Sequence, residues 1–436
     1  MDEPWLHDLL DRATMSEPAI GPLALNALRA GIRRRRRRRA QGTVACVAAA
    51  ALIGTAAVAA ARTSGTPAAR PARVTGPTTT WVLSGEGNLY AIPDSTKLRS
   101  KKILLPGGRQ FMAITPNGRT VYVSGGEPNA VIPVSAVTHK VGKPIEFGRE
   151  VPEEMLITPN GKTVYVLPDG GNEIIPIATA TNTLEKPIRT GEGVGGQYQM
   201  AITPDGKTLY AVSSKMPFTG PSYVVPIATA TNKPGKPIKI QNGATVALVM
   251  NPDGRTVYAL AQSSTGTEII PIATATNTPG KPVSVGGNAA QAITPDGQIL
   301  YVVKYSIKTP TSGVIPVATA TNTPEKQIKI EGWPYGMAVT PDGGTAYVAS
   351  QPRQSLGPTC TGQTGLVTPL STATNRRGRP IRVACDPFAI VVTPDGKTVW
   401  VGSRNWVTPI STATGKPGKP IKFRGGFVAI AVAVRP

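Results

Sequence analysis

Short apolar segments of strand length alternate with polar turns from Trp81 to the end of the chain. One unit shows the pattern clearly, with four segments that we name a, b, c and d in chain order: Met200–Thr203, Thr208–Val212, Tyr223–Ala228 and Lys236–Ile240. The segments are rich in Val, Ile and Tyr, which favour strands, and turns interrupt them too often for helices. The pattern predicts four short antiparallel strands in each unit.

The turn between segments a and b repeats as Pro-Asp-Gly or Pro-Asn-Gly. Its copies begin at Pro116, Pro159, Pro204, Pro252, Pro295, Pro341 and Pro394, so the unit recurs every 43 to 53 residues. Pro presets the first turn position, Asp or Asn bonds the local backbone, and Gly takes the site with positive φ. A second turn, Ala-Thr-Ala-Thr-Asn, joins segments c and d at residues 178–182, 228–232, 273–277 and 318–322. Four-stranded units of this period are typical of β-propeller blades.

The two ends of the repeat region complement each other. Residues 81–106 supply only segments b, c and d, whereas residues 427–434 supply only segment a. Joined, they form one composite closing blade that leaves no open sheet edge. With the seven complete units this predicts an all-β, eight-bladed propeller, or a seven-bladed one if the two ends do not pair. Prolines inside segments c and d, such as Pro226 and Pro237, predict sheet edges or bulges there because proline cannot donate to a ladder.

An uncharged run, Thr43–Ala61, precedes the repeats and follows seven arginines, Arg33 to Arg39. Its length approaches that of a membrane-spanning helix, and the positive-inside rule keeps the arginines in the cytoplasm. We therefore expect a basic cytoplasmic tail over residues 1–42, a single transmembrane helix over 43–62, a flexible linker over 63–80 and an extracellular propeller over 81–436. Cleavage within residues 57–60, which would release a secreted protein, stays open as an alternative.

The chain is basic, with a formal net charge of +22 and only 5% aromatic residues. Such charge attracts nucleic acid, anionic lipid or acidic polymers. The positive charge is spread along the sequence, and the aromatic residues that usually alternate with basic residues in nucleic-acid-binding sites are few. The pattern therefore disfavours a nucleic-acid-binding function. We expect membrane lipid as a partner through residues 43–62, and an extracellular protein, a glycan or an acidic wall polymer as a partner of a monomeric propeller.

Motifs of catalysis are missing from the sequence. It contains no nucleophile elbow, no zinc-binding His-Glu-x-x-His and no phosphate-binding loop. The repeated Asp of the a–b turns is explained by turn geometry. We expect no cofactor, although calcium stays open because acidic residues fall in one set of loops: Glu127, Glu173, Glu192, Glu268 and Glu331.

Strand direction divides the connections into two faces. The a–b and c–d turns lie on one face, here the turn face, and the b–c and d–a loops lie on the other, here the loop face. The b–c loops vary in length, which favours the loop face for binding. Its aromatic and basic residues are the ligand-binding candidates: Tyr198, Lys215, Trp333, Tyr335, Arg353, Arg404 and Trp406. Cys360 and Cys385 fall in loops of one unit on this face, which predicts a disulfide between them outside the cell.

The run TPDGKTLYAVSS…VVPIATATNKPGKPIKI resembles the YVTN-type β-propeller repeat family, which is related to lactonase-like and surface-layer propellers. The resemblance covers about residues 81–436, although no unit reads YVTN and the usual Asp of the c strand is Ala in several units. It implies a secreted or surface-bound protein. We expect a non-catalytic extracellular binding or scaffold module on a single-pass anchor. The alternative is a calcium-assisted lactonase-like hydrolase on the same propeller. Between the two, the sequence favours a protein that is not an enzyme, and the hydrolase stays open.

Overall fold

A computed structural model describes residues 77–434, with gaps at 94–99, 127, 169–172, 192–199, 215–221, 241–243, 264–265, 286–290, 305–311, 353–363 and 424–425. The described residues all belong to the second of two units into which the chain divides, Thr43–Pro436. They contain strands and turns and no helix able to cross a bilayer. The predicted anchor over residues 43–62 lies outside the described residues.

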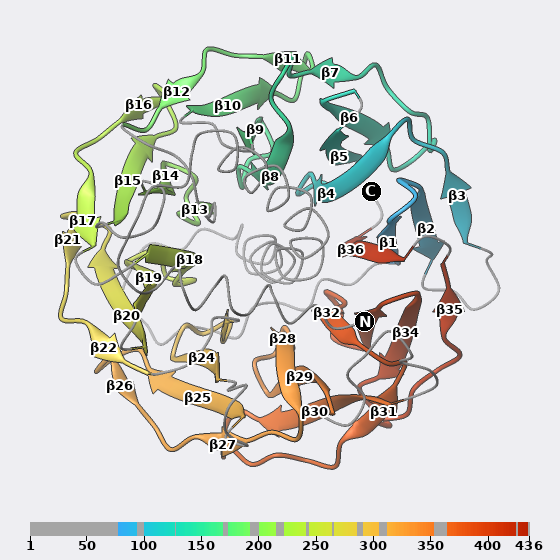
Figure 1. The fold of residues 1–436 in the computed structure, drawn as a ribbon, viewed down its shortest axis with the longest axis vertical. Coiled ribbons are helices and arrows are strands. Elements are labelled where there is room, and N and C mark those ends of the chain that lie inside the picture. Colours follow the sequence, from blue (N-terminus) through green and yellow to red (C-terminus); the bar gives the residue numbers. More distant parts are fainter. Residues whose placement is uncertain are drawn as a thin grey trace, which may run out of the picture. The chain divides into compact units, whose positions relative to one another are not determined.

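Eight antiparallel sheets stand in a ring around one axis and form an eight-bladed propeller (Figure 1). We number the blades from 1, the composite blade, to 8 in chain order. The innermost strands of blades 1 to 8 are β36 (Phe427–Val434), β4 (Gly108–Ile114), β8 (Pro152–Ile157), β13 (Met200–Ile202), β18 (Ala244–Met250), β23 (Gln291–Ile293), β28 (Trp333–Val339) and β32 (Pro387–Val392). The second strands are β1 (Thr78–Ser84), β5 (Thr120–Gly126), β9 (Thr163–Pro168), β14 (Thr208–Ser214), β19 (Thr256–Ser263), β24 (Ile299–Lys304), β29 (Thr345–Gln351) and β33 (Thr398–Ser403). The third strands are β2 (Leu89–Pro93), β6 (Ala130–Ser135), β10 (Glu173–Ala178), β15 (Ser222–Ala228), β20 (Gly266–Ala273), β25 (Gly313–Ala318), β30 (Gly365–Ser371) and β34 (Trp406–Ser411).

The outermost strand is the least regular element of each blade. It is a single short strand in blades 1, 2, 7 and 8: β3 (Lys101–Ile103), β7 (Ile145–Glu146), β31 (Ile381–Val383) and β35 (Ile421–Lys422). In blades 3 to 6 it is split in two: β11 (Thr183–Leu184) and β12 (Ile188–Arg189), β16 (Lys233–Pro234) and β17 (Ile238–Ile240), β21 (Thr278–Pro279) and β22 (Val283–Ser284), and β26 (Thr323–Pro324) and β27 (Ile328–Lys329).

The ring closes as predicted, through the two ends of the repeat region. β1 pairs with β36 in an antiparallel register that runs from Thr78 opposite Val434 to Leu83 opposite Ala429. The composite blade therefore exists and the number of blades is eight. The first strand begins at Thr78, three residues before the predicted start of the propeller, because Thr78, Thr79 and Thr80 continue the register against β36, and Thr79 and Thr80 also pair with β2.

Proline explains where the outer strand breaks. Segment d is the outer edge strand, as the prolines predicted, and the break in blade 4 contains Pro237. The prediction is wrong for segment c, since β15 lies between β14 and the outer strand. Pro226 of β15 has no N–H to offer toward the outer strand, and only its carbonyl is used there, by the N–H of Gly235 at 2.7 Å.

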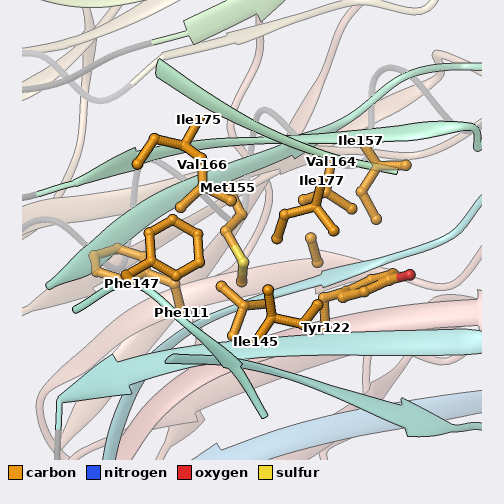
Figure 2. Packing of buried hydrophobic residues seen from close by; sticks show 12 residues of the cluster. Phe111, Tyr122, Ile145, Phe147, Met155, Ile157, Val164, Val166, Ile175 and Ile177 are labelled. Atoms are coloured by element: carbon orange, nitrogen blue, oxygen red, sulfur yellow. The ribbon is translucent and has the colours of Figure 1, made fainter. Parts of the chain in front are cut away.

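The core consists of layers between neighbouring blades, since side chains alternate between the two faces of each sheet. Figure 2 shows one layer, where Phe111, Tyr122 and Ile145 of blade 2 meet Met155 and Ile177 of blade 3. All five are buried. Burying such side chains contributes roughly 1.5–3 kcal/mol each, so the layers hold the ring together.

The a–b turns explain why the Thr-Pro-Asp-Gly motif repeats. In blade 4, Oδ1 of Asp205 accepts hydrogen bonds from Oγ1 of Thr203 at 2.6 Å and from the N–H of Lys207 at 3.0 Å. Gly206 has a φ of 71°, and a Cβ built there would lie 3.2 Å from Cδ of Pro159 in the preceding blade. The turn aspartates thus hold the turns, and successive turns stack on one another around the ring.

The c–d turns connect each blade to its predecessor. In several blades the tyrosine of the second strand donates a hydrogen bond to the asparagine of the next c–d turn: Tyr122 to Asn182, Tyr165 to Asn232, Tyr210 to Asn277 and Tyr301 to Asn375. These asparagines have φ values from 52° to 56°, in the left-handed region that Asn tolerates better than most residues. The Asn of the repeat therefore closes a turn and also joins two blades.

Candidate functional site

Bulges mark the loop-face ends of the innermost strands. The register shifts between Pro152 and Glu154 in β8, between Pro334 and Gly336 in β28, and between Pro387 and Ala389 in β32. The extra residue is Glu153, Tyr335 or Phe388, and a bulge turns its side chain away from the regular alternation of the strand. Side chains of different chemistry are therefore presented near the axis on the loop face.

Asp386 organises the loop face of blades 7 and 8. It lies between β31 and β32, and its φ of 61° is in the left-handed region that favours glycine. Its N–H donates a 2.6 Å hydrogen bond to Oε1 of Gln351, and its Oδ2 lies 3.4 Å from Nη2 of Arg404. The carboxylate and the guanidinium are both partly exposed, so the pair is open to a ligand and contributes little to stability.

An aromatic and basic pair lies beside Arg404 in blade 8. Trp406 begins β34 and is paired in register with Lys422 of β35. Nζ of Lys422 lies 5.5 Å from the centroid of the indole ring, a cation–π distance. The N–H of Phe423 donates a 2.8 Å hydrogen bond to the carbonyl of Asn405, which holds the Arg404 loop against the outer strand.

Blade 7 brings a second aromatic pair to the same face. Trp333 opens β28 opposite Gln351, the residue whose side chain accepts from Asp386. Tyr335 is the bulged residue two positions later, and both rings are partly exposed. Gln351 and Asp386 therefore link the aromatic residues of blade 7 to Arg404 and Trp406 of blade 8.

The structure places four of the seven predicted ligand-binding residues at the loop-face ends of neighbouring blades, Trp333 and Tyr335 in blade 7 and Arg404 and Trp406 in blade 8. Tyr198, Lys215 and Arg353 lie outside the described residues. The same holds for Cys360, so its disulfide with Cys385, which is buried after β31, stays a prediction.

The loop-face acids that left calcium open form no cluster of three or more metal-ligating groups within the described ranges. Glu127 and Glu192 lie outside the described residues, and Glu173 forms an ion pair with Arg189, 2.8 Å between Oε1 and Nε. Within the ranges that the structure describes, no three carboxylate, imidazole or thiol groups lie close enough to share a metal ion.

Sequence reasoning missed Glu154, which follows the bulge of β8. Its Oε1 accepts a 3.0 Å hydrogen bond from the N–H of Met200 in blade 4, and its Oε2 is enclosed without a hydrogen-bond partner among the described residues. The pKa of this carboxyl is raised to about 8, because burial and the neighbouring charge of Glu153 raise it by more than the Met200 hydrogen bond lowers it. An alignment of the repeat units would have singled out Glu154, because the small residues Gly336 and Ala389 occupy its position in blades 7 and 8.

Comparisons with known proteins identify the fold and nothing finer. No family model matches the chain. No curated protein matches it either. Among solved structures, hydrazine synthase of Kuenenia stuttgartiensis is similar with a TM-score of 0.53 and 20% identity, over 73% of this chain and 99% of that one. Dihydro-heme d1 dehydrogenase NirN is similar with a TM-score of 0.58 and 14% identity, over 83% and 75%. AztD from Citrobacter koseri is similar with a TM-score of 0.56 and 10% identity, over 82% and 98%. At such identities the likeness concerns the propeller alone.

Proposed function

We propose that the chain is a non-catalytic extracellular binding or scaffold module of the YVTN type, held at the membrane by a single-pass anchor over residues 43–62. The arginine run before the apolar segment supports this orientation. The chain enters the propeller at Thr78, which is the turn-face end of β1. A tether at this end leaves the loop face pointing away from the membrane, where a ligand can reach it.

The observation that carries the binding role is the arrangement of Arg404, Trp406 and Lys422 beside Asp386. A partly exposed indole offers a flat apolar surface. Lys422 beside the indole, and Arg404 two residues before Trp406 in the chain, suit acidic groups or sugar hydroxyls. Asp386 and Gln351 hold Arg404 in place, so less ordering is needed when a ligand binds. A glycan or an acidic wall polymer fits these groups best.

Retention of the full-length protein on immobilised polymers tests this role. The probes are a neutral glucan, an acidic polysaccharide and a phosphate-linked glycerol polymer. Trp406→Ala should lose retention on the polymer that the wild type binds, because the stacking surface is removed. Lys416→Ala in the same blade, on the turn face, is the matched control and should be retained like the wild type. Equal retention of all three proteins would refute a role for this site.

A second candidate function rests on Glu154. A carboxyl with a pKa of about 8 is protonated at neutral pH and can act as a general acid, which a lactonase-like hydrolase would need. Glu150, whose Oε2 is also enclosed without a hydrogen-bond partner among the described residues, lies in the d–a loop that leads into β8. Lactone and ester turnover that calcium chelation abolishes and Glu154→Gln removes would favour this hydrolase over the binding module.

A further inference from the structure

Basic residues gather on the turn face of the propeller. One group follows the a–b turns: Arg119, Lys162, Lys207, Arg255 and Lys397. A second group lies in or next to the c–d turns: Lys140, Lys143, Lys186, Lys233, Lys236, Lys281, Lys326, Arg376, Arg377, Arg379, Lys416 and Lys419. All of them are exposed. They are distributed over blades 2 to 8, so they form a ring of positive charge rather than a stripe.

Few acids balance this ring. The turn aspartates are engaged locally, as Asp205 and Asp395 are by the Oγ1 of a threonine and a lysine N–H. Glu185 and Glu325 are the acids of the c–d turns, and each accepts a hydrogen bond from an asparagine of the following blade. Asp205 and Asp395 also pair with basic residues of the ring, with Lys207 at 3.5 Å and with Lys397 at 3.6 Å. The seventeen basic residues of the two groups still outnumber the five aspartates and two glutamates of these turns. On the loop face the two signs also meet, in the pairs Glu173–Arg189 and Asp386–Arg404. The excess positive charge therefore points to one side.

Exposed apolar side chains lie on the same face. Three of the four large apolar residues that are clearly exposed in the described ranges lie there: Val137 and Val141 in the c–d turn of blade 2 and Leu184 in that of blade 3. The fourth, Leu104, follows β3 in a d–a loop of the loop face. Val137 is 60% exposed. Blade 2 is next to blade 1, where the chain enters at Thr78, and Trp81 of blade 1 contacts His139 in the same turn, with ring centroids 5.8 Å apart. Apolar and basic groups thus occur together close to the point of entry.

We propose that the turn face rests on anionic lipid headgroups of the membrane that anchors the chain. Basic residues within a Debye length of an anionic surface are attracted to it, and shallow apolar side chains strengthen such contacts. The inference rests on the proposed function in one respect: the anchor over residues 43–62 decides which membrane the turn face meets. Lipid fits better than nucleic acid because the described turns carry no Trp, Tyr or Phe on which a base could stack.

Amine footprinting of the full-length wild type in vesicles tests the proposal. An amine-reactive reagent and mass spectrometry report the labelling rate of each lysine in phosphatidylcholine vesicles with and without phosphatidylglycerol. Lys233, Lys236 and Lys281 on the turn face should be labelled about fivefold more slowly when the anionic lipid is present, and high salt should remove the difference. Lys239 and Lys329, exposed on the outer strands nearer the loop face, are the matched controls and should not change.

The outcomes separate this inference from the anchor. Resistance to alkaline extraction reports insertion of residues 43–62 independently. Inserted protein whose turn-face lysines react equally in both vesicles would overturn the proposal while leaving the anchor intact. Slower labelling of extractable protein would support the docking face without the anchor. Equal protection of these lysines by duplex DNA without vesicles would overturn the proposal in favour of a nucleic-acid surface. The charge reversals K233E, K236E and K281E combined should abolish the protection elsewhere on the turn face, whereas K239E, K329E and R382E, on the outer strands nearer the loop face, should not.

Discussion

The hydroxyl of Tyr165 in blade 3 donates a 2.7 Å hydrogen bond to Oδ1 of Asn232, which lies 67 residues later in blade 4. Nδ2 of the same Asn232 donates to Oε2 of Glu185, back in blade 3, at 3.2 Å. The asparagine thus closes its own turn and holds the preceding blade at two points. This contact recurs around the ring, so the packing between blades is specified by the turn motif as well as by the apolar layers.

Tyr165→Phe should lower the free energy of unfolding by about 1 kcal/mol, because one partly buried hydrogen bond is removed and the side-chain volume changes little. Tyr347→Phe is the matched control. Tyr347 occupies the same place in blade 7, but the next turn carries Gly415, which has no side chain to accept a hydrogen bond. Urea denaturation monitored by circular dichroism measures both. Equal losses in the two variants would mean that the Asn contact contributes nothing specific.

Alkaline pH should unfold the protein through these tyrosines. Burial raises the pKa of Tyr122, Tyr165, Tyr210 and Tyr301 to about 12, above their ordinary value of 10.0. Because the folded state holds these protons more tightly, the stability that they contribute is present below pH 10 and is lost as pH rises toward 12. Absorbance of tyrosinate against pH should show delayed ionisation that coincides with unfolding. Ionisation of all tyrosines near pH 10 in the folded protein would contradict this.

Gly206→Ala should destabilise the propeller by about 1–2 kcal/mol, because alanine is strained at a positive φ. The added methyl would also crowd Pro159 of the preceding blade. Gly108→Ala is the control, since a Cβ there meets nothing within 4 Å. Thermal unfolding compares the two variants. A Gly206→Ala melting temperature equal to that of Gly108→Ala would exclude the turn as a constrained element.

Much of the fold can be predicted from the sequence because it depends on local signals. Residues 81–106 lack segment a and residues 427–434 supply one, and this count alone predicts the composite blade. The function of Asn232 cannot be predicted in that way, because its partner Tyr165 belongs to another blade. The same limit applies to the basic turn face. Residues such as Lys207 and Lys236 look scattered in the sequence and gather on one face only when the blades form a ring.

The candidate site could be predicted in part for a related reason. Trp333 and Tyr335 lie in the blade next to that of Arg404 and Trp406, because blade order follows chain order and consecutive units become neighbouring blades. Glu154 escaped notice because it follows the acidic bulge residue Glu153, and a pair of glutamates at the start of a strand resembles an ordinary surface. Its hydrogen-bond partner, Met200, belongs to the next blade, and no local pattern indicates that contact.

Glu154→Gln should stabilise the protein increasingly as pH rises. The folded-state pKa of about 8 exceeds the ordinary value of 4.5, so the wild type loses stability between these two pH values, by up to about 1.4 kcal/mol for each pH unit. Gln stays neutral and keeps an oxygen for the N–H of Met200. Glu146→Gln, on the exposed part of β7, is the control. A gain from Glu154→Gln that does not vary between pH 5 and pH 8 would contradict the raised pKa.

Oxidised protein should contain the disulfide between Cys360 and Cys385. Reduction should cost about 3 kcal/mol of stability, because the bond closes a loop of about 25 residues. Alkylation of the denatured protein before and after reduction, followed by mass spectrometry, measures the state of each thiol. Cys46 should react without reduction and is the internal control. Free alkylation of all three cysteines would exclude the bond.

Isothermal titration calorimetry of the full-length protein with the retained polymer tests the binding role most directly, because it records binding and turnover together. The account predicts a saturable heat of binding with no continuing heat, lost in the double variant Arg404→Gln and Trp406→Ala and kept in Lys416→Ala. A steady heat of reaction that chelation of calcium abolishes, or binding that the double variant leaves unchanged, would contradict a non-catalytic module that binds its ligand on the loop face.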